Sequence, residues 1–184
     1  SGAIGTDIGT ITITNSGGTT FSSTVSASTV TLTNTTGTIT FNGAVTATTL
    51  NTAAQAYNVA LNASSGTITN AVTFSNTGTL ALGASAGTLT FNGGLTATAP
   101  SASTLKGTIT GSNDAITFGL ITLGADTTIN TVATTNVADL SMGAVTGAGY
   151  NLSLVTGGVA GAEITGTSVS GVGTLTITNS GGTT

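Results

Sequence analysis

The chain has 184 residues, of which only 3% are charged, and its formal net charge at pH 7 is −4; a typical soluble domain carries about 25% charged residues. The lack of Cys and His excludes thiol chemistry, a disulfide framework, a Cys/His zinc site and an imidazole base. One Lys without any Arg excludes a nucleic-acid partner, because nothing in the chain can neutralise a row of phosphates.

Composition also argues against disorder and against a membrane-spanning helix. Disordered chains combine low hydrophobicity with high net charge, whereas 38% of these residues are hydrophobic and the net charge is small. The sequence has no run of about 18 apolar residues, the length that a transmembrane helix needs. We therefore expect no membrane insertion of this segment.

A short repeat begins near the N-terminus and recurs along the chain. Residues 17–30 (GGTTFSSTVSASTV) align without a gap with residues 37–50 (GTITFNGAVTATTL), at an offset of 20. Residues 87–99 (GTLTFNGGLTATA) repeat the theme, and GTIT begins again at two further glycines. The structural repeat positions are Gly17, Phe21, Gly37, Phe41, Asn42, Gly43, Gly66, Gly87, Phe91, Asn92, Gly93 and Gly107.

The spacing of the repeat starts predicts the length of one turn of the chain. The starts fall at residues 17, 37, 66, 87 and 107, so that the successive spacings are 20, 29, 21 and 20. The common value predicts a 20-residue turn. The one long spacing predicts an insertion within residues 51–65.

Apolar and polar residues alternate strictly within each repeat. After Gly37, the side chains of Ile39 and Phe41 point to one side and those of Thr38 and Thr40 to the other. A period of two with β-branched residues is typical of β-strands, and a Thr- and Gly-rich sequence is unfavourable for a helix. Asn, Gly, Ser and Thr form corners between these runs, which predicts about three short strands per turn.

Two all-β folds can use such strands, a parallel β-solenoid (β-helix) and an antiparallel β-sandwich. In a solenoid, Phe21 stacks near Phe41 and Thr20 near Thr40, so that like residues form ladders along the axis. A sandwich gives no reason for residues to recur at the same spacing along the chain. We therefore predict a solenoid of about nine turns, which at about 4.8 Å per turn is roughly 45 Å long; the sandwich stays the alternative.

A second repeat links the two ends of the sequence. Residues 9–20 (GTITITNSGGTT) and 173–184 (GTLTITNSGGTT) agree at eleven of twelve positions, at an offset of 164. This offset defines a long period that is close to eight of the short turns. We interpret residues 1–184 as a single solenoid segment that contains one such period of a longer tandem array or of a fibre subunit.

The repeats resemble the β-strand repeats of large bacterial surface proteins, of the filamentous-haemagglutinin-like adhesin and autotransporter-passenger type. The resemblance lies in GTITFNGAVTA (residues 37–47), GTLTFNGGLTA (87–97) and AITFGLITLGADTTINT (115–131). It covers the chain from about residue 9 to residue 131, and again at the C-terminus. It implies a secreted, right-handed parallel β-helix that is exposed at the cell surface.

The threonines suggest one surface function. Flat arrays of Thr on a solenoid can match an ice lattice, but Thr is also the β-branched residue that tolerates water, and we favour this simpler interpretation. The stripes are Thr10/Thr12/Thr14, Thr38/Thr40, Thr67/Thr69, Thr88/Thr90, Thr108/Thr110 and Thr174/Thr176/Thr178.

The carboxylates and tyrosines suggest no reaction centre. The spacings between Asp114, Asp126 and Asp139 are 12 and 13, which do not fit the length of one turn, and there is no Asp-rich calcium loop. We expect isolated, solvated carboxylates and neither catalytic, cofactor-binding nor metal-binding residues. Tyr57 and Tyr150 could stack on a sugar, but corner packing is the default interpretation.

These features predict a structural protein and not an enzyme. A solenoid ends in open sheet edges, which natural proteins cap or disguise, and here the last twelve residues repeat an earlier segment. We predict an extracellular or cell-surface fibre, filament or sheath component that assembles with itself end to end and side by side, without cofactors. The alternative is an adhesin rod that binds glycans or other surfaces, with carbohydrate as its partner, and ice binding is a remote third.

Overall fold

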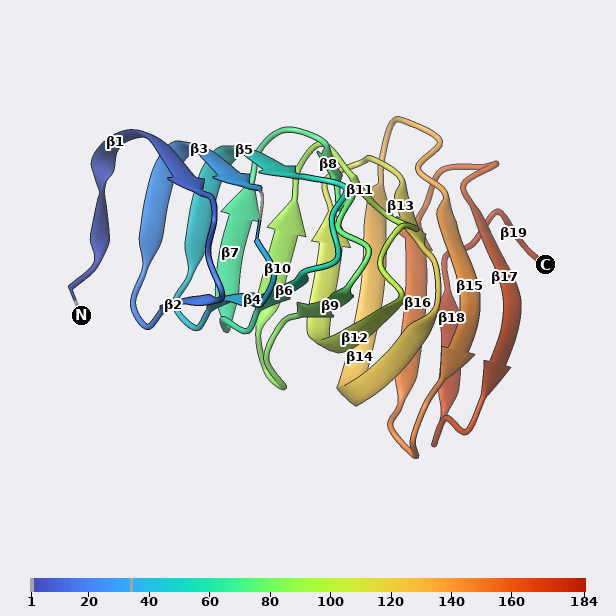
Figure 1. Cartoon of the computed structure of the whole chain (residues 1–184). Helices are drawn as coiled ribbons and strands as arrows, with labels where there is room; N and C mark the ends of the chain where they lie inside the picture. The colour runs from blue at the N-terminus through green and yellow to red at the C-terminus, as the bar shows by residue number, and fades with distance from the viewer. Residues whose placement is uncertain (1, 34) are drawn as a thin grey trace.

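The computed structural model describes residues 2–33 and 35–184 and shows a parallel β-solenoid. Figure 1 shows the coils stacked along one axis, with the two termini at opposite ends of the stack. Every strand pairing in the described residues is parallel, and the strands form about eight stacked coils. The predicted solenoid is confirmed, and the antiparallel sandwich is excluded.

Short strands separated by polar corners make up the whole described chain. The strands are β1 (Ile4–Ile13), β2 (Thr19–Phe21), β3 (Val25–Leu32), β4 (Thr38–Phe41), β5 (Val45–Thr52), β6 (Asn58–Leu61), β7 (Ser65–Ile68), β8 (Val72–Thr73), β9 (Thr79–Leu82), β10 (Thr88–Phe91), β11 (Leu95–Ala97), β12 (Ala102–Gly111), β13 (Ile116–Phe118), β14 (Ile121–Ala133), β15 (Leu140–Thr146), β16 (Leu152–Gly157), β17 (Glu163–Ser170), β18 (Leu175–Thr178) and β19 (Gly182–Thr183). Among these described elements, no helix is of a length and apolarity that would allow it to cross a membrane.

Three faces run along the solenoid. The first face contains β2, β4, β6 and β9, the first halves of β12 and β14, and the second halves of β15 and β17. The second face contains the first halves of β1, β3 and β5, then β7, β10, the second halves of β12 and β14, β16 and β18. The third face contains the second halves of β1, β3 and β5, then β8, β11, β13, the first halves of β15 and β17, and β19.

The coils become longer toward the C-terminus. Phe21 pairs with Phe41, an offset of 20 in the sequence, whereas Thr127 pairs with Leu152, an offset of 25. Because each longer coil uses more of the chain, the structure has about eight coils and not the nine that a constant turn length predicts.

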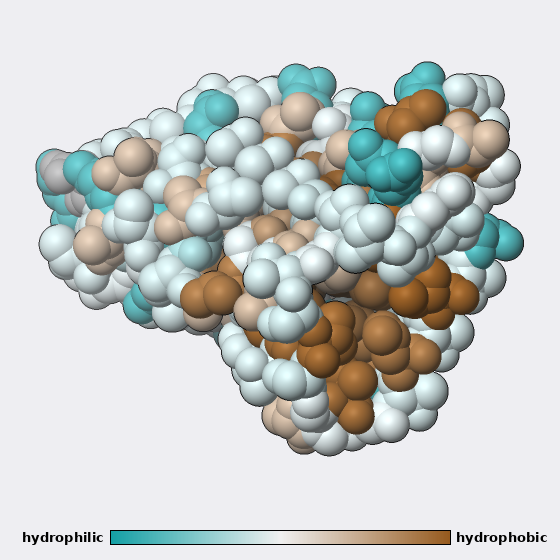
Figure 2. Space-filling view, turned by 90° about the vertical axis from the view of Figure 1, so that its right-hand side faces the viewer, coloured by the Kyte–Doolittle hydropathy of each residue, from teal (hydrophilic) through white to brown (hydrophobic). Residues whose placement is uncertain are grey.

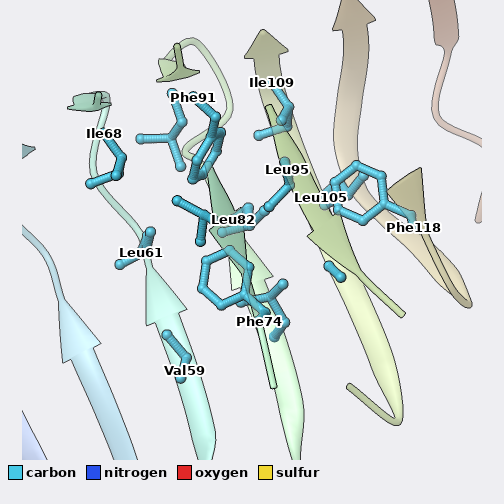
Figure 3. Packing of buried hydrophobic residues seen from close by; sticks show 14 of the residues in the cluster. Val59, Leu61, Ile68, Phe74, Leu82, Phe91, Leu95, Leu105, Ile109 and Phe118 are labelled. Atoms are coloured by element: carbon cyan, nitrogen blue, oxygen red, sulfur yellow. The ribbon is translucent and has the colours of Figure 1, made fainter. Parts of the chain in front are cut away.

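The core is a narrow column of apolar side chains inside the coils. Leu61, Leu82 and Leu105 come from successive coils of the first face and follow one another along the axis (Figure 3). The rings of Phe74 and Phe91 meet edge to face, with centroids 6.3 Å apart. The alternation in the sequence therefore sorts residues as expected, with apolar side chains inside and Thr, Ser and Asn outside.

The predicted insertion within residues 51–65 is wrong. The N–H of Asn58 donates to the carbonyl of Gly37, so the coil after Gly37 begins again near residue 57. Gly66 lies in β7 on the second face, where it pairs with Val45 and Leu89. The long spacing between Gly37 and Gly66 arises because the GTIT motif moves from the first face to the second.

The Phe-Asn-Gly motif changes face in the same way. Phe41 ends β4 on the first face, whereas Phe91 ends β10 on the second. All three faces need the same alternation of apolar and polar residues, so the motif fits either place. The two corner pairs that follow these phenylalanines are Asn42-Gly43 and Asn92-Gly93.

Glycine is required where one corner runs directly against the next. A Cβ atom on Gly37 would collide with the backbone carbonyl of Gly17, whereas a Cβ atom on Gly17 would meet nothing within 4 Å. Gly107 lies where β12 bends from the first face to the second; its φ is +66°, and a Cβ there would lie 2.6 Å from the carbonyl oxygen of Gly87.

Candidate functional site

The C-terminal end of the solenoid exposes core side chains. In β18, Leu175 and Ile177 pair with the buried Leu152 and Leu154 of the coil beneath, so they occupy inward positions. They are nevertheless 42% and 41% exposed. Inward-facing apolar side chains are buried in the middle coils. The exposure of Leu175 and Ile177 therefore marks an inner surface that no further coil covers in the described chain.

A shallow apolar hollow lies at this end. It has a volume of about 150 Å³, and its lining includes Met142, Leu154, Ile164, Val169, Leu175 and Ile177. Figure 2 views the molecule from this side and shows apolar atoms gathered over the end of the stack. We call this surface the C-terminal end surface; contiguous exposed apolar surface of this kind marks interaction sites.

The sheet edges at this end are open as well. Among the described residues, β18 pairs only with β16, and β19 only with β17. Each strand therefore has one edge whose backbone N–H and C=O groups are available to another strand.

The N-terminal end has a matching character. Ile8 in β1 is 39% exposed, and Ile4, Ile11 and Phe21 are only partly buried against the core. Within residues 2–33 and 35–184, β1 pairs only with β3, and β2 only with β4. Both ends thus present apolar side chains beside unpaired parallel edges.

The twelve-residue motif that occurs near both ends lies on different faces. In the first copy, residues 10–13 belong to β1 on the third face. In the second copy, Leu175–Thr178 form β18 on the second face. The offset between the copies therefore does not correspond to a whole number of turns in this structure.

The Thr-X-Thr stripes are divided among the three faces. Those of β4 lie on the first face, those of β10 and β12 on the second, and that of β1 on the third. Double rows run through β1, β3 and β5 on the third face and through β10, β12 and β14 on the second, and each has Asn in place of the last Thr. The double row of the second face is Thr88/Thr108/Thr128 beside Thr90/Thr110/Asn130.

A polar groove of about 310 Å³ runs beside this double row, across five coils. Its lining includes Thr88, Thr108, Asp126, Asn151, Ser153 and Thr176. The two oxygens of the Asp126 carboxylate accept hydrogen bonds from the backbone N–H and the side-chain amide of Asn151, at 2.8 and 3.1 Å. This surface, the Asp126 groove, offers hydroxyls, an amide and one carboxylate to a polar ligand.

Two of the other predicted carboxylates, Asp114 and Asp139, lie just before strands β13 and β15. Asp139 accepts a hydrogen bond from the N–H of Glu163, at 2.9 Å. Across the described residues, no three Asp or Glu side chains are placed to share a metal ion. Asp114 and Asp139 lie in corners of neighbouring coils, because they precede the paired strands β13 and β15 and the N–H of Ile116 donates to the backbone carbonyl of Asp139 at 2.9 Å.

Tyr57 is a fully buried corner residue. Its hydroxyl donates to the carbonyl of Leu32 at 2.9 Å and accepts from the N–H of Ala53 at 3.0 Å. Burial raises the pKa of the Tyr57 hydroxyl, and the hydrogen bond from Ala53 opposes this effect. Tyr57 therefore packs in a corner and cannot stack on a sugar, while Tyr150 is 40% exposed.

The fold defines the class of protein, a parallel β-solenoid built from repeats. Comparison with protein-family models, with curated proteins and with solved structures finds no match for this chain.

Proposed function

We propose that this chain is a structural rod in an extracellular or cell-surface fibre, continued at its ends by further solenoid coils. The observation that carries the proposal is the half-exposure of Leu175 and Ile177 at inward positions of β18. The proposed role is non-enzymatic and needs no cofactor. The resemblance of the repeats to those of bacterial adhesins and autotransporter passengers supports the location and adds no catalytic role.

Energetics favour continuation over an open end. Full burial of a completely exposed Leu or Ile side chain stabilises by about 1.5–3 kcal/mol, and Leu175 and Ile177, which are 42% and 41% exposed, would gain the remaining part of this. Pairing the open edges also satisfies backbone groups. An N-terminal end that meets a C-terminal end is a head-to-tail contact, which generates filaments instead of closed dimers. With a net charge of only −4, electrostatic repulsion between copies is weak.

Analytical ultracentrifugation over a wide concentration range tests the proposal. We expect the chain to associate with increasing concentration and Leu175→Lys to weaken this association strongly, because the ammonium would be buried in the contact. The matched control is Thr176→Lys, whose side chain points outward from the same strand and should leave association unchanged. A chain that stays monomeric at every concentration, or two variants with equal behaviour, would overturn the proposal.

The Asp126 groove favours a second candidate function, an adhesin rod that binds carbohydrate. A groove that crosses five coils suits an extended chain, and its hydroxyls, amide and carboxylate suit the hydroxyls of a neutral oligosaccharide. Calorimetry with neutral oligosaccharides tests this: Asp126→Asn should weaken binding, and Asp7→Asn, in β1 at the far end, should not. Absence of binding in the unmodified chain would remove this candidate.

A further inference from the structure

For the first copy of the twelve-residue motif, the structure shows which strand of the next coil packs over it. In β1, Ile11 pairs with Val30 and Ile13 with Leu32, so that the second half of β3 lies over the motif. Ile13 is buried as a result. The motif is thus already seen in this chain with its cover in place.

The second copy presents the same positions without a cover. By the offset of 164, Leu175 corresponds to Ile11 and Ile177 to Ile13. In the first copy, residues 21–32 follow the motif directly and supply the covering strand. The segment that would cover the exposed side chains of β18 is therefore known from the same structure: it is a strand with the sequence of the second half of β3.

We infer that the C-terminal end surface is closed by a second copy of residues 21–32, and that each long period of the sequence moves the pattern by one face of the solenoid. The inference rests on the proposed function, because it names the coil that continues the rod. It also assigns that coil a register, with the Val30 equivalent over Leu175 and the Leu32 equivalent over Ile177.

The path of the chain supports the assignment without any insertion. In the first copy, β2 lies on the first face, residues 25–27 on the second and residues 29–32 on the third. In the second copy, β19, the equivalent of the start of β2, lies on the third face. The same steps would place the equivalents of residues 25–27 on the first face and those of residues 29–32 on the second, directly over β18.

The shift of one face has a consequence for a fibre. After three periods, the motif returns to its starting face. A feature confined to one face within a single period, such as the Asp126 groove, would then recur on all three faces of the fibre. Such a rod presents the same surface to partners on every side.

The test extends the chain after Thr184 with the sequence of residues 21–52. Because the chain has no Cys, disulfides can report the register: Thr176→Cys is paired with Cys at the Thr31 equivalent of the extension. Adjacent strands are about 4.8 Å apart, which lies within the Cα separation that a disulfide spans. The positive control is Thr12→Cys with Thr31→Cys in the original chain, since these two residues already pair. A second variant of the extended chain keeps the cysteine of the extension and carries Gly182→Cys in place of Thr176→Cys; Gly182 lies on the third face and pairs with the exposed Glu163, so its side chain would point outward.

We expect oxidation to cross-link Thr176→Cys to the extension and to leave Gly182→Cys free, and hydrogen exchange at Leu175–Thr178 to slow to the rate of β16. A cross-link at Gly182→Cys instead would overturn the shift of one face, while the continuing rod would stand. Loss of both cross-links, with β18 exchanging as before and the positive control intact, would overturn the inference and the proposed continuation together.

Discussion

The aromatic ring of Phe21 lies on the ring of Phe41, with the centroids 4.8 Å apart and an angle of 8° between the ring planes. This separation equals the spacing of neighbouring strands in a sheet, so the two side chains stack as the backbones of β2 and β4 do. Phe41 is fully buried, whereas Phe21 belongs to the end of the stack and is only partly covered.

Phe41→Ala should lower the free energy of unfolding by about 3–5 kcal/mol, because it leaves a cavity inside the core. Phe21→Ala should cost clearly less, since water already reaches part of its ring. Denaturant titration measures both, and the double variant should reveal a coupling of about 0.5–1.5 kcal/mol from the stacked pair. Equal losses in the two single variants would contradict the position of Phe21 at the end of the stack.

Gly37→Ala should destabilise the solenoid by about 1–3 kcal/mol, the usual cost of overpacking, because the new methyl group collides with the carbonyl of Gly17. The matched control is Gly17→Ala, whose methyl group meets nothing within 4 Å. Thermal unfolding followed by circular dichroism compares them. If the two variants have the same melting temperature, the corner at Gly37 does not pack directly against the corner at Gly17.

Tyr57→Phe should cost about 1–3 kcal/mol, because the variant removes a hydroxyl that bonds two backbone groups in a buried corner. Tyr150→Phe is the matched control at an exposed position and should leave stability unchanged. Denaturant titration at neutral pH measures the difference. A Tyr57→Phe variant as stable as the parent chain would show that these hydrogen bonds add nothing.

The same tyrosine predicts a dependence of stability on alkaline pH. Burial raises the pKa of Tyr57 in the folded chain, whereas a tyrosine in the unfolded chain ionises near pH 10. The folded state therefore holds the proton more tightly, so this contribution is complete below about pH 10 and is lost as the pH rises above it. The loss should disappear in Tyr57→Phe and persist in Tyr150→Phe; a loss unchanged in Tyr57→Phe would assign it to other groups.

Asn113 should control the loop at residues 134–136. Its side-chain oxygen accepts hydrogen bonds from the N–H groups of Thr134, Thr135 and Asn136, at 2.7, 2.9 and 3.0 Å. Asn113→Ala removes this acceptor, so hydrogen exchange at the three amides should accelerate. Asn113→Asp keeps an acceptor and should preserve most of their protection. Unchanged exchange in Asn113→Ala would contradict the arrangement.

Much of the stacking could be predicted from the sequence because the repeats keep their register. Phe21 pairs with Phe41, Val25 with Val45 and Val30 with Leu50, as the alignment indicated. The alternation fixes which side chains point inward, and the repeat length fixes which residues lie one coil apart.

The face occupied by each repeat could not be predicted. Gly66 and Gly87 begin motifs like that at Gly37, but they lie along the second face. A strand with alternating apolar residues and Thr packs equally well on any face, so such a motif specifies its own orientation and not its place in the coil. The hydrogen bonds of Tyr57 and Asn113 were also beyond prediction, because they join residues whose proximity depends on the length of each coil.

Cryo-electron microscopy of the concentrated chain would show directly whether one solenoid continues into the next. We expect unbranched rods longer than one molecule, with coils repeating about every 4.8 Å along the axis and no discontinuity where copies meet. Short single particles at every concentration, with each end sealed by its own chain, would contradict the proposed continuation.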